Sequence, residues 1–153
     1  MRIFIFDIDD TIILHTKENI NYYDHPNKNT VLKDLLDELN YDKIYIYTNG
    51  TYGHGESVVE NLYLNVDGIF ARDNIPYMKP YIASFNYVDF MIKKENISNH
   101  EIYFFDDLLD NLKTANRKGW ITIWITNKKT EKPYYVDLVF TNIYEALMWF
   151  LIK

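Results

Sequence analysis

Two aspartates stand two positions apart near the start of the chain, in the stretch Asp7-Ile8-Asp9. In an extended segment, side chains two residues apart point the same way, so Asp7 and Asp9 can act on one bound group. One carboxylate can attack phosphorus while the other donates and accepts a proton. Such an attack forms an aspartyl phosphate and splits one very slow hydrolysis into two easier steps. The pair is therefore suited to hydrolysing a phosphate ester.

Two further aspartates, Asp106 and Asp107, follow an apolar run that is typical of a buried strand, as Asp7 does. In parallel α/β sheets, ligands bind beyond the carboxyl ends of the strands, so these carboxylates and that of Asp9 would meet at one edge of the sheet. Four carboxylates this close repel one another and need a cation to stay ionised. Oxygen ligands in a rigid cluster suit Mg²⁺, which also bridges to phosphate oxygens. We therefore expect Mg²⁺ as the cofactor, held by this cluster.

Residues that could hold a phosphoryl group follow another predicted strand. Thr48 offers a hydroxyl, and Asn49 and Gly50 offer backbone N–H groups to phosphoryl oxygens. Lys79 adds a positive charge that would balance the nucleophile and the phosphate. A lysine before a proline carries little information by itself, and its weight here comes from the rest of the set. The expected catalytic residues are Asp7, Asp9, Thr48 and Lys79.

The elements that must position these residues alternate between strand and helix along the chain. Apolar runs predict strands over residues 2–6, 43–47, 68–71, 101–105, 120–125 and 136–140. Helical spacing of apolar residues predicts helices over residues 30–39, 56–64, 80–94, 108–118 and 143–152. Pro80 suits the first turn of the helix predicted over residues 80–94, and Gly119 would end the helix predicted over residues 108–118. The alternation is typical of βαβ units and predicts an α/β fold with a mostly parallel sheet.

Length and composition bound the class of protein. A chain of 153 residues has the length of one domain and can bury one core without disulfides. It contains no cysteine, which excludes a thiol nucleophile and a thiolate metal site. Carboxylates interrupt the first apolar run, unlike in a signal peptide, and no apolar stretch has the length of a membrane span. We expect a soluble, cytoplasmic protein that does not act at a membrane.

Charge is unevenly distributed in this acidic chain. The net charge of −6 gives no long-range attraction for polyanions. Six basic residues nevertheless gather in one stretch with few acids: Lys113, Arg117, Lys118, Lys128, Lys129 and Lys132. The stretch is either the solvated surface of a helix and loop or a modest docking patch for an anionic partner, and both interpretations stay open.

Four motifs resemble those of the haloacid dehalogenase-like hydrolases, in the same order and over nearly the whole chain. They are Phe6-Asp7-Ile8-Asp9-Asp10-Thr11, Tyr47-Thr48-Asn49-Gly50, Lys79-Pro80, and Phe104-Phe105-Asp106-Asp107 followed by Asn111. The resemblance implies a three-layer Rossmann-like fold with Asp7 as nucleophile and Asp9 as general acid and base. It also implies that Thr48 and Lys79 hold the phosphoryl group. The implied Mg²⁺ ligands are Asp7, the backbone carbonyl of Asp9 and Asp107, with Asp106 nearby.

Finer features are similar to those of the pyrimidine 5′-nucleotidase group of this superfamily. They are the stretch from Lys79-Pro80 through Asn111 to Trp120-Ile121-Thr122 and the closing Thr141-Asn142-Ile143-Tyr144-Glu145-Ala146-Leu147. The superfamily also contains dehalogenases and phosphonatases, but an acid and base at Asp9 is what hydrolysis of a phosphate ester requires. The resemblance therefore implies a phosphatase for a nucleotide or another small phosphate.

The chain departs from the family pattern where relatives insert a cap domain. Residues 12–29 and 71–78 are each too short for an independent domain, so we expect one domain over residues 1–153 with a short flap at about 12–29. A site without a cap suits a macromolecular phosphate (a nucleic-acid end or a phosphoprotein), a homo-oligomer whose neighbour covers the site, or a loosely selective phosphatase. A non-catalytic binding protein on this fold is a further alternative, although every residue that the chemistry requires is present.

Aromatic and histidine side chains near the site could recognise the substrate. The candidates are His15, Tyr22, Tyr23 and His25 in the expected flap, and Tyr52 and His54 after Thr48. An aromatic ring could stack on a base, and a histidine could bond a phosphate or a ribose. An ordinary surface loop explains each of them as well. His54 stands out because it lies in the stretch Gly50-Thr-Tyr-Gly-His-Gly55, whose glycines would let the backbone approach a ligand closely.

Overall fold

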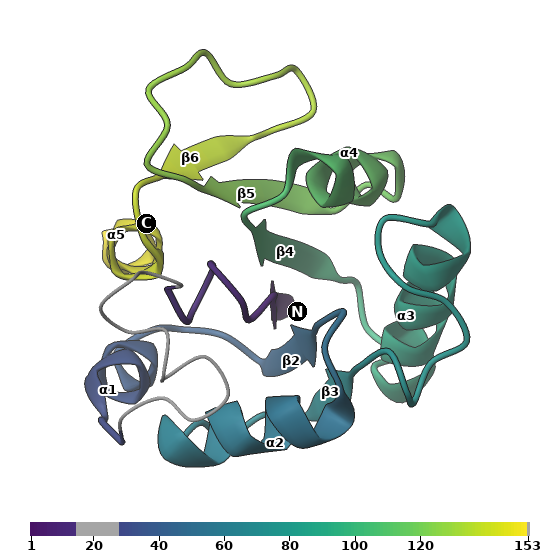
Figure 1. Cartoon of the computed structure of the whole chain (residues 1–153), viewed down its shortest axis with the longest axis horizontal. Coiled ribbons are helices and arrows are strands. Elements are labelled where there is room, and N and C mark those ends of the chain that lie inside the picture. Colours follow the sequence, from purple (N-terminus) through teal and green to yellow (C-terminus); the bar gives the residue numbers. More distant parts are fainter. Residues whose placement is uncertain (15–27, 153) are drawn as a thin grey trace.

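The computed structural model describes residues 1–14 and 28–152 as a parallel β-sheet with helices on both faces (Figure 1). The strands are β1 (Arg2–Phe6), β2 (Lys43–Tyr47), β3 (Gly68–Phe70), β4 (Glu101–Asp106), β5 (Ile121–Ile125) and β6 (Leu138–Phe140). The helices are α1 (Val31–Asp37), α2 (Tyr52–Asn61), α3 (Ile82–Glu95), α4 (Leu109–Arg117) and α5 (Ile143–Leu151). Across the sheet the order is β3-β2-β1-β4-β5-β6, and every neighbouring pair is parallel.

The strand β1 lies in the middle of the sheet, between β2 and β4. Its side chains alternate between the two faces, so that Phe4 and Phe6 belong to one core and Ile3 and Ile5 to the other. All four are completely buried. A strand that is covered on both faces appears in the sequence as one continuous apolar run, which is why the bounds of β1 could be predicted.

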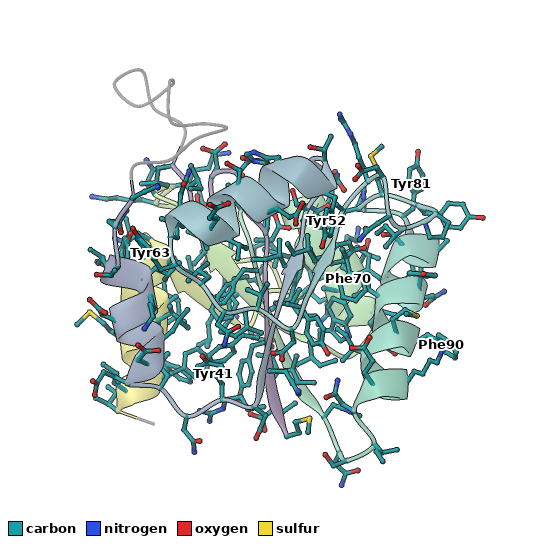
Figure 2. All side chains as sticks on the ribbon, turned by 90° about the horizontal axis from the view of Figure 1, so that it is seen from below. Tyr41, Tyr52, Tyr63, Phe70, Tyr81 and Phe90 are labelled. Atoms are coloured by element: carbon teal, nitrogen blue, oxygen red, sulfur yellow. The ribbon has the colours of Figure 1, made fainter. Side chains whose placement is uncertain are left out.

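The helices form the outer two of three layers. Helices α1, α2 and α5 cover the face that carries Phe4 and Phe6, whereas α3 and α4 cover the opposite face (Figure 1). Side chains fill the space between helices and sheet on both sides (Figure 2). Aromatic rings make much of this contact: Phe150 of α5 lies 5.1 Å from Phe4 between ring centroids. The predicted three-layer fold with a mostly parallel sheet is confirmed, and the described sheet is parallel throughout.

The predicted start of α2 is wrong by four residues, because the helix begins at Tyr52 rather than at residue 56. Thr51 caps the helix, with its hydroxyl oxygen accepting a hydrogen bond from the backbone N–H of His54 at 3.1 Å. The glycines at 53 and 55 therefore lie inside the first turns of a helix, not in a ligand-binding loop. Glycine lowers helix propensity, which hid this turn in the sequence.

The expected place of Pro80 in the first turn of a helix is also wrong, because α3 begins at Ile82. The side chain of Asn49 bonds both backbone groups of Lys79: Asn49 Nδ2 donates to Lys79 O at 3.0 Å, and Lys79 N donates to Asn49 Oδ1 at 2.9 Å. These bonds hold the segment before Pro80 outside the helix.

Most of the expected flap, residues 15–27, lies outside the described residues, and so do His15, Tyr22, Tyr23 and His25. Just before it, Ile12 and Ile13 are buried in the core that contains Phe4. Residues 1–14 and 28–152 form no cap domain over the sheet. None of the helices in this part of the chain combines the length and the apolar character that crossing a bilayer requires.

Candidate active site

Three strand ends bring predicted site residues to one edge of the sheet. Asp7 directly follows β1, Thr48 follows β2, and Asp106 is the last residue of β4. The backbone hydrogen bonding of the sheet continues through Asp7 and Thr48, since Asp7 N donates to Phe105 O at 3.0 Å and Thr48 N donates to Phe70 O at 2.9 Å. Parallel strands end at the same edge of the sheet, so sequence positions about forty and a hundred residues from Asp7 become its neighbours.

The ammonium group of Lys79 is buried at this edge, with only 3% of the residue exposed. Its Nζ donates to Asp7 Oδ1 at 2.9 Å, to Asp106 Oδ2 at 2.9 Å and to Tyr47 O at 2.8 Å. These bonds use all three hydrogens of the ammonium. Burial lowers the pKa of Lys79, but the carboxylates of Asp106 and Asp7 outweigh that effect and raise it. The site therefore contains a fixed positive charge against Asp7.

The turn after β2 supports this lysine. Asn49 holds the backbone of Lys79 through the two bonds described above, so the second and third motifs act as one unit. The backbone N–H of Gly50 donates to Thr48 Oγ1 at 3.0 Å. Thr48 is almost completely buried. The expected phosphate-binding residues Thr48, Asn49, Gly50 and Lys79 thus lie together, with Asn49 bonding a lysine backbone.

Asp106 anchors the lysine and the start of α4. Its Oδ2 accepts hydrogen bonds from Lys79 Nζ and from Asn111 Nδ2, the latter at 3.1 Å, and its Oδ1 accepts from Leu108 N at 2.9 Å. The residue is completely buried. Both carboxylate oxygens are therefore engaged by protein donors, one of which is Asn111 of the fourth motif.

Three carboxylates form a compact cluster. One oxygen each from Asp7, Asp106 and Asp107 lies within 4.8 Å of the others. Thr11 Oγ1 donates to Asp7 Oδ2 at 2.9 Å and lies 3.5 Å from Asp107 Oδ1. Trp124 Nε1 donates to the backbone carbonyl of Asp107 at 3.0 Å and fixes its position. Neither Thr11 nor Trp124 was singled out in the sequence as a supporting residue.

The protein environment opposes full ionisation of this cluster. Burial, together with the charge of Asp106, raises the pKa of Asp7 to about 6 despite the nearby Lys79. Burial and the charges of Asp7 and Asp106 raise the pKa of Asp107 to about 8. A divalent cation among these oxygens would reverse both effects. The donor set, which consists of oxygens alone, fits Mg²⁺.

Without metal, the free energy of unfolding is expected to fall as pH rises from about 4 to about 8, because both folded pKa values lie above the ordinary 3.8. In that range the folded protein holds protons that the unfolded chain has released. This contribution stabilises the fold at low pH and is lost as pH rises through about 6 for Asp7 and about 8 for Asp107. Thermal melting in EDTA across this range measures it. Asp107→Asn should show a shallower pH dependence, and an unchanged slope would contradict the prediction.

The carboxylate of Asp9 lies apart from this cluster and contacts a histidine. His54 Nε2 is 3.0 Å from Asp9 Oδ1, and the two side chains are 9% and 22% exposed. Asp9 precedes a tight turn in which the backbone N–H groups of Ile12 and Ile13 point to Ile8 O, at 2.9 and 3.1 Å. The side chain expected to transfer protons therefore has one defined protein partner on α2.

The remaining predicted substrate-reading residues are placed as follows. Tyr52 is 38% exposed at the first position of α2 (Figure 2), and its backbone N–H donates to Asp73 Oδ1 at 2.7 Å. His54 is a largely buried residue of the same turn, not a surface loop residue. His15 lies outside the described residues.

A groove of about 870 Å³ adjoins the site along the carboxyl ends of β4, β5 and β6. Asn49, Lys79 and Asp107 line the end at which the chemistry would take place. The rest of the lining is mixed in character: it includes apolar Leu14, Leu108 and Leu109, polar Thr126, Asn127, Thr141 and Asn142, the cationic Lys128 and the carboxylates of Asp10 and Asp110. The volume of this groove lies within the range of pockets that bind small molecules in proteins.

No family model matches this chain, and no curated protein does. Solved structures do resemble it. A dehalogenase superposes with a TM-score of 0.63 at 17% identity, over 85% of this chain and 59% of that protein. The HAD-hydrolase YfnB from Bacillus subtilis, bound to magnesium, gives 0.64 at 19% identity, over 80% of this chain and 54% of YfnB.

A third structure matches over almost its full length. A hydrolase of the haloacid dehalogenase-like family from Streptococcus pneumoniae superposes with a TM-score of 0.63 at 16% identity, over 97% of both chains. By contrast, this chain spans 59% of the dehalogenase and 54% of YfnB. At these identities the likeness concerns the fold, and the chain has the three-layer fold of the haloacid dehalogenase-like hydrolases.

Proposed function

We propose that this chain is a phosphomonoesterase that requires Mg²⁺ and forms an aspartyl phosphate on Asp7. The observation that carries the proposal is the 2.9 Å contact between Asp7 Oδ1 and the buried ammonium of Lys79, next to the carboxylate of Asp107. An anionic nucleophile can approach an anionic phosphate only where positive charge offsets their repulsion. Lys79 supplies one such charge, and the carboxylate cluster is suited to hold another.

Two steps follow from the placement of the two aspartates. In the first, an oxygen of Asp7 bonds to phosphorus as the ester P–O bond breaks, and Asp9 gives its proton to the leaving oxygen. In the second, Asp9 takes a proton from water, whose oxygen bonds to phosphorus as the P–O bond to Asp7 breaks. The products are an alcohol and inorganic phosphate, and both aspartates return to their initial state. Thr48 accepts from Gly50 N, so its own hydroxyl hydrogen can be donated to a phosphoryl oxygen.

The expected Mg²⁺ would be held by Asp7, Asp107 and the backbone carbonyl of Asp9. Asp106 contributes charge to the same cluster, but its two oxygens already accept bonds from Lys79, Leu108 and Asn111. When bound, the ion would neutralise the charge that develops on the phosphoryl oxygens. The magnesium bound to the structural relative YfnB supports this choice of metal.

Dehalogenases among the structural relatives make halide displacement the rival chemistry. A carboxylate nucleophile serves both reactions, so Asp7 does not separate them. Asp9 does, because an alkoxide needs a proton to leave and a halide does not. Asp9 is partly exposed beside the site and has a defined partner in His54, which favours a phosphate ester as the substrate.

The expected result is Mg²⁺-dependent phosphate release from p-nitrophenyl phosphate and from at least one nucleoside monophosphate, lost in EDTA and restored by Mg²⁺. Nucleoside monophosphates come first because of the similarity to the 5′-nucleotidase group. The same preparation is assayed for chloride release from 2-chloropropionate. Chloride release without phosphate release would overturn the proposal in favour of a dehalogenase.

A macromolecular phosphate is the second candidate substrate, and the groove is the observation that favours it. The groove extends past Asp107 to the segments after β5 and β6 and includes Lys128. Two residues of the basic stretch already have partners within the protein, since Lys118 lies 3.9 Å from Asp89 and Lys132 donates to Val136 O at 2.8 Å. A 5′-phosphorylated oligonucleotide and a phosphopeptide therefore join the substrate panel. A higher kcat/KM for either than for the best small phosphate would favour this candidate.

A further inference from the structure

We propose that His54 is a positioning residue that holds the carboxyl group of Asp9 in the orientation for proton transfer; this inference rests on the proposed phosphatase function. The chain thereby uses the first turn of α2, directly after the phosphate-binding turn, to orient its general acid. The geometry that points to this role is the 3.0 Å contact between His54 Nε2 and Asp9 Oδ1.

The backbone of His54 is fixed by its place at the start of α2. Its N–H donates to Thr51 Oγ1 at 3.1 Å, and the neighbouring N–H of Tyr52 donates to Asp73 Oδ1 at 2.7 Å. Gly55, one residue further, packs so closely on β3 that an added Cβ would lie 3.0 Å from Ile69 Cγ2. Helix α2 therefore packs directly on the sheet at Gly55, and the imidazole of His54 extends from a closely packed turn.

The ring of His54 occupies space that a glycine leaves open. A Cβ on Gly50 would lie 3.1 Å from His54 Cδ2 and 3.3 Å from Thr48 Oγ1. Gly50 is thus the residue that lets the imidazole lie against the phosphate-binding turn while Thr48 keeps its own position. With 9% of its side chain exposed, His54 has little freedom to change rotamer.

The contact decides which oxygen of Asp9 carries the transferred proton. After Asp9 has given up its proton, its carboxylate can only accept hydrogen bonds, so Nε2 then bears a hydrogen and donates it to Oδ1. With Oδ1 engaged in this way, the proton that Asp9 takes from water binds to Oδ2. As the bond from Asp7 to phosphorus forms and the ester bond breaks, the Oδ2 proton passes to the leaving oxygen, and the His54 bond keeps the carboxyl plane from rotating.

The test compares two substrates that differ in their need for an acid. An alkyl phosphate, such as a nucleoside monophosphate, needs a proton on its leaving oxygen, whereas p-nitrophenolate leaves without one. The measured quantity is kcat/KM, which covers steps up to the first irreversible phosphoryl transfer and so excludes the later hydrolysis of the aspartyl phosphate.

His54→Ala is expected to lower kcat/KM for the alkyl phosphate by about 10–100-fold, and for p-nitrophenyl phosphate by less than about 3-fold. His54→Gln keeps an N–H donor near the position of Nε2 and should recover much of the lost rate. Gly53→Ala is the matched control in the same turn, because a Cβ there meets no atom within 4 Å, and it should behave as wild type on both substrates.

Equal losses on the two substrates, or no loss on either, would overturn the positioning role while leaving the phosphatase function intact. A wild-type protein that releases phosphate from neither substrate would overturn the proposed function and this inference with it. Should His54→Ala fail to fold, the same comparison with His54→Gln and His54→Asn decides, since an asparagine amide is too short to reach Oδ1. A larger alkyl-phosphate loss for Asn than for Gln supports the proposal, and equal losses refute it.

Discussion

Asp7→Asn is expected to lower Mg²⁺-dependent phosphate release by about 10⁴-fold or more, because the carboxamide is not a nucleophile. The substitution keeps the shape of the side chain, and Lys79 retains its bonds to Asp106 Oδ2 and Tyr47 O. The fold should therefore persist. Single-turnover release from the best substrate of the panel measures the effect, and a residual rate above a trace would remove Asp7 from its proposed role.

The same variant is expected to melt at a higher temperature than wild type in EDTA. Burial and the charge of Asp106 disfavour the ionised form of Asp7, and removing that charge also relieves Asp107. The stabilisation by Mg²⁺ should shrink at the same time, because the metal loses a ligand. Asp37→Asn, at an exposed carboxylate paired with Lys33, serves as the control for a generic loss of charge. A lower melting temperature for Asp7→Asn would show that the Lys79 contact outweighs the repulsion.

Lys79→Met should abolish activity and lower the free energy of unfolding by about 3–5 kcal/mol, because it leaves two buried carboxylates without their cation. Asp106 and Asp7 both accept from Lys79 Nζ at 2.9 Å, and Asp106 is completely buried. Urea denaturation in metal-free buffer measures the loss. Lys33→Met is the matched control at an exposed pair with Asp37, where the change should stay below about 1 kcal/mol.

A double variant separates the loss of activity from the loss of stability that Lys79→Met causes. Adding Asp106→Asn to Lys79→Met removes one of the orphaned charges and should recover part of the stability, but no activity. The recovery follows from charge removal inside the protein, where an unpaired carboxylate is costly. If Lys79→Met unfolds at the same urea concentration as wild type, the ion pairs contribute nothing to stability and the argument fails.

The strand ends of this site were predictable because two simple regularities coincide. Buried parallel strands appear as apolar runs, and their carboxyl ends share one edge, so Asp7, Thr48 and Asp106 could be grouped from the sequence. The alternation of strands and helices gave the fold class for the same reason. Helix boundaries near glycine and proline were less accurate, since the bonds that set them come from Thr51 and from Asn49 across the fold.

The partners of the catalytic side chains were not predictable in the same way. Nothing in the spacing indicates that Asn49 bonds the backbone of Lys79, or that His54 contacts Asp9. The first contact joins residues 30 positions apart in the sequence and the second joins residues 45 positions apart. They depend on how the segment before α3 and helix α2 pack in the folded protein. The glycines around His54 favour a ligand-binding turn when only the sequence is considered, because the close packing of Gly55 on Ile69 exists only in three dimensions.

Because β1 lies at the centre of the sheet, a change in its length affects both the active site and the core. Within five residues this strand supplies two aromatic side chains to one core and two isoleucines to the other, and Asp7 follows at the next position. Inserting or deleting a single codon there would exchange the faces of every side chain and put Ile8 or Phe6 where the nucleophile belongs. Insertions and deletions in the groove or the helices would leave Asp7 in place, whereas one in β1 would change the position of the nucleophile and the central packing together.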